Sequence, residues 1–202
     1  MLIAVRHGKT SSNEQGHEKL RGWLPIGLNE EGMEDSQRTA DYLSDLEGVD
    51  GIYCSDLVRT VQSADPICRV LGLPLQATDR LRDLNTGDFA GGEISPALLK
   101  TLQDYILHPD KVIPGGESVG EWIDRVGSMF KMLVESHELN IAVVHGRGMT
   151  LLLALCKTQG DYPDVDTLLL LPPVSPSGVM IVGHDWKLVY MSQKEPDQSR
   201  LS

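Results

Sequence analysis

The stretch Val5-Arg6-His7-Gly8-Lys9-Thr10 is the part of this sequence that says most about the fold. It ends the apolar run Leu2 to Val5, whose length and composition predict a short buried strand. Charged residues then begin abruptly, and loops leaving the carboxyl ends of strands are where α/β proteins bind ligands. Gly8 predicts a close approach of the backbone to that ligand, with no Cβ in the way. Arg6 and His7 are therefore candidate ligand-binding residues.

The same pattern returns late in the chain. The apolar run Ile141 to Val144 predicts a second buried strand, and His145-Gly146-Arg147 follows it. A third predicted strand, Gly51 to Cys54, precedes Arg59, which falls in the first turn of a predicted helix. Free backbone N–H groups and the helix dipole favour anions there, and a guanidinium matches phosphate oxygens with a planar fork. Because each of these residues follows a predicted strand, and the carboxyl ends of parallel strands lie at one edge of a sheet, His7, Arg59 and His145 can meet there.

Strands alternate with amphipathic helices along the chain. Helices are predicted over 29–46, over 57–71 with a break or kink at Pro66, over 96–107, and from a Ser118/Glu121 capping box to about His137. Residues 168–171 are a candidate edge element, and 178–191 predict a hairpin. This order predicts an α/β fold, a three-layer sandwich with a mostly parallel central sheet flanked by helices and an antiparallel edge strand. We interpret residues 1–202 as one domain, with 193–202 as a flexible polar tail.

The composition of the chain indicates which kinds of molecule it does not bind. The net charge of −11 argues against general nucleic-acid binding and against docking on an anionic membrane. The three cysteines lack C-x-x-C spacing and are expected to be reduced core thiols. No signal peptide or bilayer-spanning run is recognised. We expect a cytoplasmic protein, a monomer or homodimer, that acts on a small molecule.

Two histidines and two arginines at one sheet edge suit a phosphoryl group. The arginines orient and neutralise the oxygens. One histidine can attack phosphorus to form a covalent intermediate, while the other hydrogen-bonds the transferring oxygens. A nearby carboxylic acid can protonate the leaving oxygen. Because charged donors supply the electrostatic stabilisation, and no residues have metal-ligand spacing, we expect neither a metal nor another cofactor.

Five segments, in order along the chain, resemble motifs of the histidine phosphatase superfamily, the phosphoglycerate-mutase-like proteins. They are Arg6 to Thr10 with Asn13, Ser55 to Thr60, Leu81 to Gly91, Pro114 to Ser118, and Val143 to Gly146. The segment Pro114 to Ser118 is similar to one found in the phosphatase branch. The resemblance extends from about Met1 to the last predicted hairpin, which covers nearly the whole chain.

The resemblance implies roles for the matching positions. His7 would be the phosphorylated nucleophile, and the phosphoryl group would be held by Arg6, Asn13, Arg59, His145 and Gly146. Asp83 stands where the family usually has the glutamate that donates a proton, and Asp88 is the alternative acid. Lys9 stands where Glu or Gln is common, and Arg21 where Gln is common. Both departures would make the mouth of the site more positive and are expected to help bind phosphate.

Three functions remain open at this point. The first is a phosphomonoesterase that hydrolyses a small phosphorylated metabolite through a phosphohistidine. The second is a phosphoglycerate-type mutase, in which the phosphoryl group returns to another hydroxyl of the substrate. The third is a non-catalytic protein that binds a phosphorylated ligand. Family mutases tend to carry longer inserts that exclude water, whereas the segment Gly91 to Ser118 is modest, so hydrolysis is favoured.

Overall fold

The computed structural model describes residues 1–13, 19–171 and 174–192. Within these ranges the strands form a six-stranded sheet in the order β3-β2-β4-β1-β5-β6. The strands are β1 (Leu2–Arg6), β2 (Gly51–Ser55), β3 (Leu75–Thr78), β4 (Asn140–Val144), β5 (Val179–Val182) and β6 (Leu188–Met191). The helices are α1 (Glu30–Leu43), α2 (Val58–Leu71), α3 (Pro96–Leu107), α4 (Val119–Glu135), α5 (Gly146–Lys157) and α6 (Val165–Leu169). The predicted tail, 193–202, lies outside the described residues.

The sheet is mostly parallel, as predicted. β1, β2, β3 and β4 pair with parallel neighbours, whereas β5 runs antiparallel to β1 and β6 antiparallel to β5. The antiparallel part is thus the predicted hairpin at one edge of the sheet. Because β1, β2 and β4 are parallel neighbours, the loops after their carboxyl ends leave the sheet on the same side.

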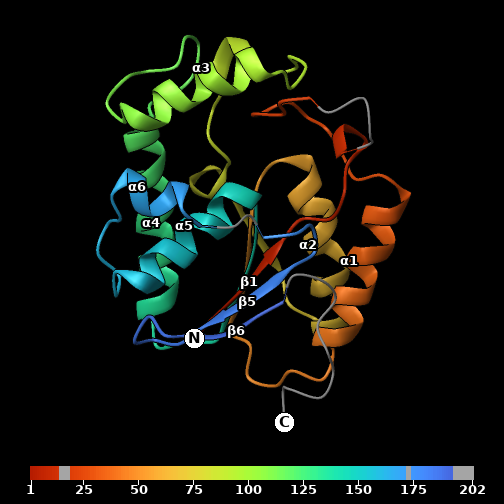
Figure 1. The fold of residues 1–202 in the computed structure, drawn as a ribbon. Coiled ribbons are helices and arrows are strands. Elements are labelled where there is room, and N and C mark those ends of the chain that lie inside the picture. The colour runs from red at the N-terminus through yellow and green to blue at the C-terminus, as the bar shows by residue number, and fades with distance from the viewer. Residues whose placement is uncertain (14–18, 172–173, 193–202) are drawn as a thin grey trace.

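Alternating side chains of β1 build the core on both faces of the sheet. Leu2 and Ala4 belong to the apolar cluster that contains residues of α4 and α5. Ile3 and Val5 belong to the cluster that contains residues of α1 and α2. Figure 1 shows the corresponding layers, with α1 and α2 on one face and α4, α5 and α6 on the other. A strand with both faces covered has no polar side, which explains the unbroken apolar run of β1.

Local signals in the sequence set several helix ends. The Asn29 side chain accepts a hydrogen bond from the Gly32 backbone N–H at 2.9 Å and caps α1. Ser118 and Glu121 form the predicted capping box of α4. Each such cap typically stabilises a helix by about 1 kcal/mol, because it satisfies backbone donors that have no partner inside the helix.

Two expectations are wrong. The helix α2 runs unbroken through Pro66, which is buried, so residues 67–71 are not a separate piece. Burial of its neighbours Ala64 and Ile67 outweighs the loss of one backbone hydrogen bond. Residues 168–171 are not a sheet-edge element, because Leu168 and Leu169 end the short helix α6, whose start is capped by Asp164.

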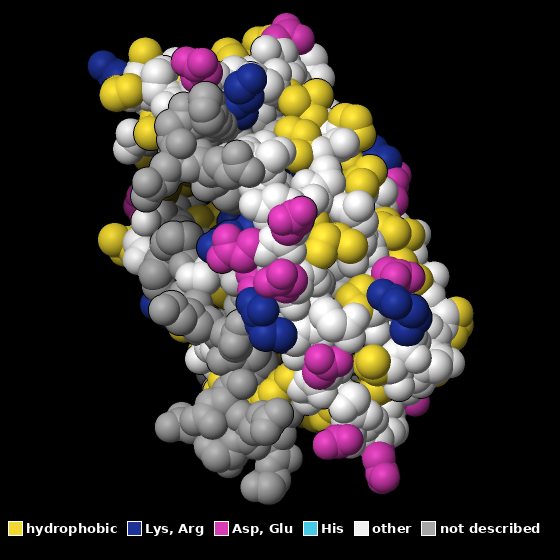
Figure 2. All heavy atoms as spheres, turned by 90° about the vertical axis from the view of Figure 1, so that its right-hand side faces the viewer, with side chains coloured by type: hydrophobic (Ala, Val, Ile, Leu, Met, Phe, Trp, Pro, Cys, Tyr) yellow, Lys and Arg dark blue, Asp and Glu magenta, His cyan; other side chains and the backbone are white. Residues whose placement is uncertain are grey.

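Segments that reach beyond the sheet cover its carboxyl edge. In Figure 1, α3 lies past the carboxyl end of β1, near the loop that follows β1. The outer face over α1, seen in Figure 2, carries acidic and basic side chains scattered among apolar ones. Among the described residues, Lys9 forms an ion pair with Glu31 and Arg69 with Asp65. None of the described helices is long and apolar enough to span a bilayer.

Candidate active site

A cavity of 290 Å³ opens at the carboxyl ends of the parallel strands. Its lining comes from the end of β1, the loops after β1 and β3, and the first turns of α5, and comprises Arg6, His7, Lys19, Leu20, Arg21, Gly22, Asp83, Ile94, Gly146, Arg147 and Thr150. His145 and Arg59 are almost fully buried beside this lining, at 1% exposure each. Segments far apart in the sequence therefore meet at this one position.

His7 is held in one tautomer. Its Nδ1 lies 2.7 Å from the Gly8 carbonyl oxygen, and because a carbonyl only accepts, Nδ1 carries the proton and donates it. Nε2 is then the ring nitrogen with the free electron pair. Burial, reinforced by His145 and nearby arginines, holds the pKa of His7 well below its usual value of 6.5. The ring is neutral at pH 7, the state that a nucleophile needs.

His145 lies next to His7, with 5.2 Å between the ring centroids and a T-shaped arrangement. It is the N-cap residue of α5, so its side chain sits at the positive end of that helix. Among the described residues neither ring nitrogen has a hydrogen-bond partner. A buried polar group without a partner costs about 1–3 kcal/mol, so an oxygen-rich ligand that bonds this ring would be stabilised.

Arg6 and Arg59 are anchored by backbone carbonyls. Arg6 donates through Nη1 to the Val174 carbonyl, and Arg59 donates to the Gly22 and Leu24 carbonyls at 2.9 and 3.2 Å. The Nε of each arginine has no acceptor among the described residues. Burial lowers the pKa of both guanidinium groups to about 10, which still leaves them charged at pH 7. Fixed, charged donors of this kind are suited to phosphoryl oxygens.

Arg21, Arg147 and Asp83 complete the charged part of the cavity. Arg21 donates to the Thr10 hydroxyl at 3.0 Å, and Arg147 donates to the Asp83 carboxylate at 3.2 Å. Burial alone would raise the pKa of Asp83, but Arg147, Arg59, the Leu84 backbone N–H and Arg21 together hold it below its usual value. Asp83 is therefore an ionised carboxylate at neutral pH in the protein without substrate.

At two positions of the site, packing against neighbouring residues requires glycine. A Cβ on Gly8 would come within 2.4 Å of the Gly32 carbonyl oxygen, so Gly8 permits the loop to pack on the first turn of α1. The sequence predicted that the missing Cβ makes room for a ligand. In the structure the missing Cβ makes room for the backbone of Gly32 instead. A Cβ on Gly146 would lie 3.0 Å from the Arg6 guanidinium carbon, so this glycine lets Arg6 lie against the start of α5.

Two predicted positions, Lys9 and Asp88, are described and do not line the cavity, and a third, Asn13, is described only in its backbone. Lys9 pairs with Glu31 on α1 and is absent from the lining, because the loop turns its side chain toward that helix. Asp88 is exposed and also absent from the lining, so Asp83 is the carboxylate that the structure places in the cavity. The side chain of Asn13 lies outside what the structure describes.

Other residues at the site had no role assigned from sequence. Arg147 and Thr150, both on α5, line the cavity. The signal for Arg147 was present, since a basic residue follows His-Gly here as it does after β1. Trp23 donates its indole N–H to the Asp83 backbone carbonyl at 2.7 Å and stacks on Arg82 at 4.5 Å. It thereby fixes the loop that carries Asp83.

The two buried histidines predict a pH-dependent stability. Burial holds the pKa of both His7 and His145 well below 6.5 in the folded protein. As pH falls below about 6.5 the unfolded chain takes up protons that the folded chain refuses. Stability should therefore be full above that pH and fall below it, by at most about 1.4 kcal/mol per pH unit for each histidine.

Chemical denaturation at pH 7.5, 6.5 and 5.5 measures this loss. The double variant His7→Gln/His145→Gln should lose less stability across the same pH range, whereas replacement of the exposed His108 should leave the loss unchanged. An equal loss in the double variant would mean that other groups cause the acid sensitivity. The lowered pKa of Asp83 acts only at still lower pH, where protonation of the carboxylate removes its ion pair.

Comparison with known proteins gives the following relationships. The sequence model of the histidine phosphatase superfamily (branch 1) matches residues 2–193. A phosphoglycerate mutase-like protein 4 from Arabidopsis thaliana is 33% identical over 155 residues, which cover 72% of this chain and 66% of that protein. A phosphoserine phosphatase 1 from Hydrogenobacter thermophilus is 28% identical over 163 residues, covering 79% of this chain and 76% of that one.

Solved structures share the fold. An alpha-ribazole phosphatase from Shigella flexneri has a TM-score of 0.77 at 21% identity, over 97% of this chain and 98% of that one. A mycobacterial glucosyl-3-phosphoglycerate phosphatase complexed with VO3 has a TM-score of 0.74 at 22% identity, with coverage of 97% and 98%. At these identities the likeness establishes the arrangement of the sheet and helices.

Proposed function

The chain belongs to the histidine phosphatase superfamily and is an enzyme with phosphatase activity, and we propose that it hydrolyses a small phosphomonoester metabolite through a phosphohistidine on His7. The observation that carries this proposal is the state of His7. The ring is buried and neutral, its Nδ1 proton is donated to the Gly8 carbonyl, and its Nε2 electron pair is free. A cytoplasmic location and a monomeric or dimeric state belong to the same proposal.

In the first step the Nε2 electron pair attacks phosphorus and the ester P–O bond breaks. The electrons of that bond stay on the leaving oxygen, which takes a proton from the Asp83 carboxyl group. Phosphohistidine carries a positive ring, which the Gly8 carbonyl stabilises through the Nδ1 proton. Splitting one displacement into two lowers the barrier of each.

In the second step water attacks the phosphohistidine. Its proton goes to the Asp83 carboxylate, the P–N bond breaks with its electrons returning to Nε2, and inorganic phosphate leaves. Asp83 is then protonated for the next substrate or exchanges its proton with solvent. One carboxyl group thus acts as acid and then as base.

Asp83 needs a proton in the first step, although its pKa is low before substrate binds. The arginines that lower this pKa are the groups that the substrate phosphoryl dianion would approach. The dianion offsets their positive charge, so the pKa of Asp83 rises in the complex. Binding of a phosphoryl dianion therefore also prepares Asp83 to carry the proton that it donates.

The alternatives predict different products. A phosphoglycerate-type mutase would retain phosphate in an isomer of the substrate, and a binding protein would release none. We favour hydrolysis because Lys19 and Ile94, which line the cavity, are exposed to solvent, and because sensing alone requires no neutral buried nucleophile. The test measures phosphate release from sugar phosphates, phosphoglycerates, phosphoserine, nucleotides and phosphorylated cofactor precursors. Release above the level of the His7→Ala protein supports the proposal, and product isomers without phosphate release contradict it.

We predict that this hydrolysis needs no divalent metal. The guanidinium groups of Arg6, Arg59 and Arg21 supply the positive charge that a metal ion provides in other phosphatases. Rates measured after extensive treatment with a chelator should equal untreated rates, and added Mg²⁺, Mn²⁺ or Zn²⁺ should not raise them. Activity that disappears with chelator and returns with one of these ions would contradict the prediction.

A further inference from the structure

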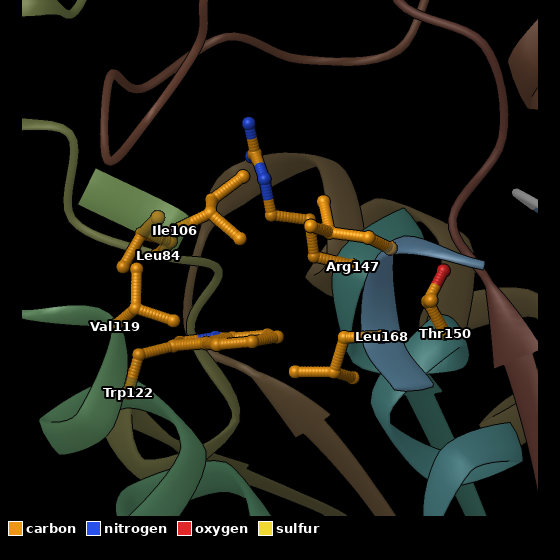
Figure 3. Close-up of a pocket in the computed structure, with 8 residues that line it drawn as sticks. Leu84, Ile106, Val119, Trp122, Arg147, Thr150 and Leu168 are labelled. Carbon is orange, nitrogen blue, oxygen red and sulfur yellow. The ribbon is translucent and has the colours of Figure 1, made fainter. Parts of the chain in front are cut away.

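A second, apolar cavity lies beside the catalytic one. Its volume is 120 Å³, and it is lined by Leu84, Ile106, Val119, Trp122, Arg147, Thr150, Leu168 and Leu169. Figure 3 shows a flat face of the Trp122 indole turned toward the space that lies between Ile106 and Leu168, with Arg147 on the opposite side. Apart from Arg147, Thr150 and the indole N–H of Trp122, which has no hydrogen-bond partner among the described residues, the lining side chains are apolar.

The apolar cavity adjoins the catalytic cavity at the proposed acid. Arg147 and Thr150 line both cavities. Asp83 lines the catalytic cavity, and Leu84, the next residue, lines the apolar one. A leaving oxygen that receives a proton from Asp83 would therefore carry its substituent toward Leu84.

We propose that this apolar cavity receives the leaving group of the substrate, which makes the preferred substrates phosphate monoesters of apolar alcohols. The inference rests on the proposed function, since it takes His7 to mark the phosphoryl position and Asp83 the leaving oxygen. It adds the chemical class of the group bonded to that oxygen.

The lining favours apolar groups over charged or hydroxyl-rich ones. The Arg147 guanidinium is engaged by the Asp83 carboxylate, so it does not offer an unopposed charge to a second acidic group. A carboxylate or several hydroxyl groups would lose water there with few partners to replace it. An apolar group loses nothing of this kind and gains free energy with each carbon buried.

The size of the cavity limits the group that fits. A cavity of about 150 Å³ lined by aliphatic and aromatic side chains binds benzene in another protein. A volume of 120 Å³ should therefore hold an alkyl group of about four or five carbons. Longer chains would extend past Leu169, which is 43% exposed.

The experiment uses n-alkyl phosphates from ethyl to octyl, whose leaving alcohols have nearly the same pKa. The value of kcat/KM should rise about fourfold with each added methylene until the cavity is full, and then level off. Glycerol phosphate and phosphoserine, which are similar in length to propyl phosphate, should react more slowly than it does. A flat series, or faster turnover of the polar esters, would overturn the inference while leaving phosphatase activity intact.

Two pairs of variants locate the effect. Leu168→Trp and Ile106→Trp place a large side chain in the cavity and should remove the dependence on chain length. Leu170→Trp and Leu107→Trp alter the neighbouring positions, which are 83% and 49% exposed and absent from the lining, and should keep the full dependence. The inference fails if Leu168→Trp and Ile106→Trp, or whichever of the two remains folded, still show the wild-type dependence on chain length.

A binding measurement separates this inference from the proposed function. Alkylphosphonates have no ester bond to break, so calorimetry reports their affinity whether or not the protein catalyses hydrolysis. Affinity that increases with chain length in the wild type and not in Leu168→Trp supports an apolar subsite even if no ester is hydrolysed. Affinity independent of chain length would overturn it even if esters are hydrolysed.

Discussion

Replacement of His7 by alanine should lower kcat/KM by about 10⁴-fold or more, because loss of a nucleophile removes the covalent route altogether. The imidazole is the part of the site that no neighbour can replace. His145, the nearest ring at 5.2 Å between centroids, lies at the start of α5 and has no carbonyl partner to fix its tautomer among the described residues. The remaining arginines would still bind phosphate, so KM should change less than kcat.

Rapid quench with substrate labelled in the phosphoryl group checks this prediction. The wild type should give a phosphoprotein that is labile to acid and stable to base, the behaviour of a phosphorus–nitrogen bond, and His7→Ala should give none. His108→Ala is the matched control, because His108 is exposed at the end of α3 and its side chain bonds only Asp104 among the described residues. Near-normal turnover and labelling in His7→Ala would rule out His7 as the nucleophile.

Replacement of Asp83 by asparagine should slow the hydrolysis of alkyl phosphates by about 10²–10⁴-fold, the usual value of general acid catalysis. An alkoxide is a poor leaving group and needs a proton as the P–O bond breaks. Nitrophenyl phosphate leaves as a stabilised phenolate, so its phosphorylation of the enzyme should slow far less. Asparagine preserves the size of the side chain and can still accept a hydrogen bond from Arg147, which limits the structural change.

Burst kinetics with both esters separates the phosphorylation step from the later steps. Asp88→Asn is the matched control, because Asp88 is an exposed carboxylate five residues further along the same loop and is absent from the cavity lining. Equal slowing of both esters in Asp83→Asn would mean that Asp83 positions substrate or maintains structure. A dependence on the leaving group in Asp88→Asn would mean that the loop rearranges when substrate binds.

The sequence locates the two histidines of the candidate site because their signal is local. A buried strand must end where its apolar run ends, and a His-Gly pair directly after it lies at the edge of the sheet where parallel strands place ligands. This argument holds for His7 and for His145. The helix caps at Asn29 and Ser118 were predictable for the same reason, since a cap involves residues only three positions apart.

The long-range contacts were not predictable in this way. Lys9 and Arg21 are both loop cations near the first strand, and the sequence treats them alike. The fold directs Lys9 to Glu31 on α1 and directs Arg21 into the cavity. The difference arises from contacts between residues distant in sequence: Gly8, next to Lys9, packs against Gly32 of α1, whereas Arg21 donates to the Thr10 hydroxyl.

Residue identities and their order along the chain thus determined the α/β class, the layers of the fold and the histidine pair, because strand length, helix period and capping act over a few residues. Tertiary structure decided the rest: the passage of α2 through Pro66, the packing role of Gly8, the Arg147–Asp83 pair and the apolar cavity beside it. Each of these depends on groups brought together from distant parts of the chain, where burial and electrostatic contacts outweigh local preference.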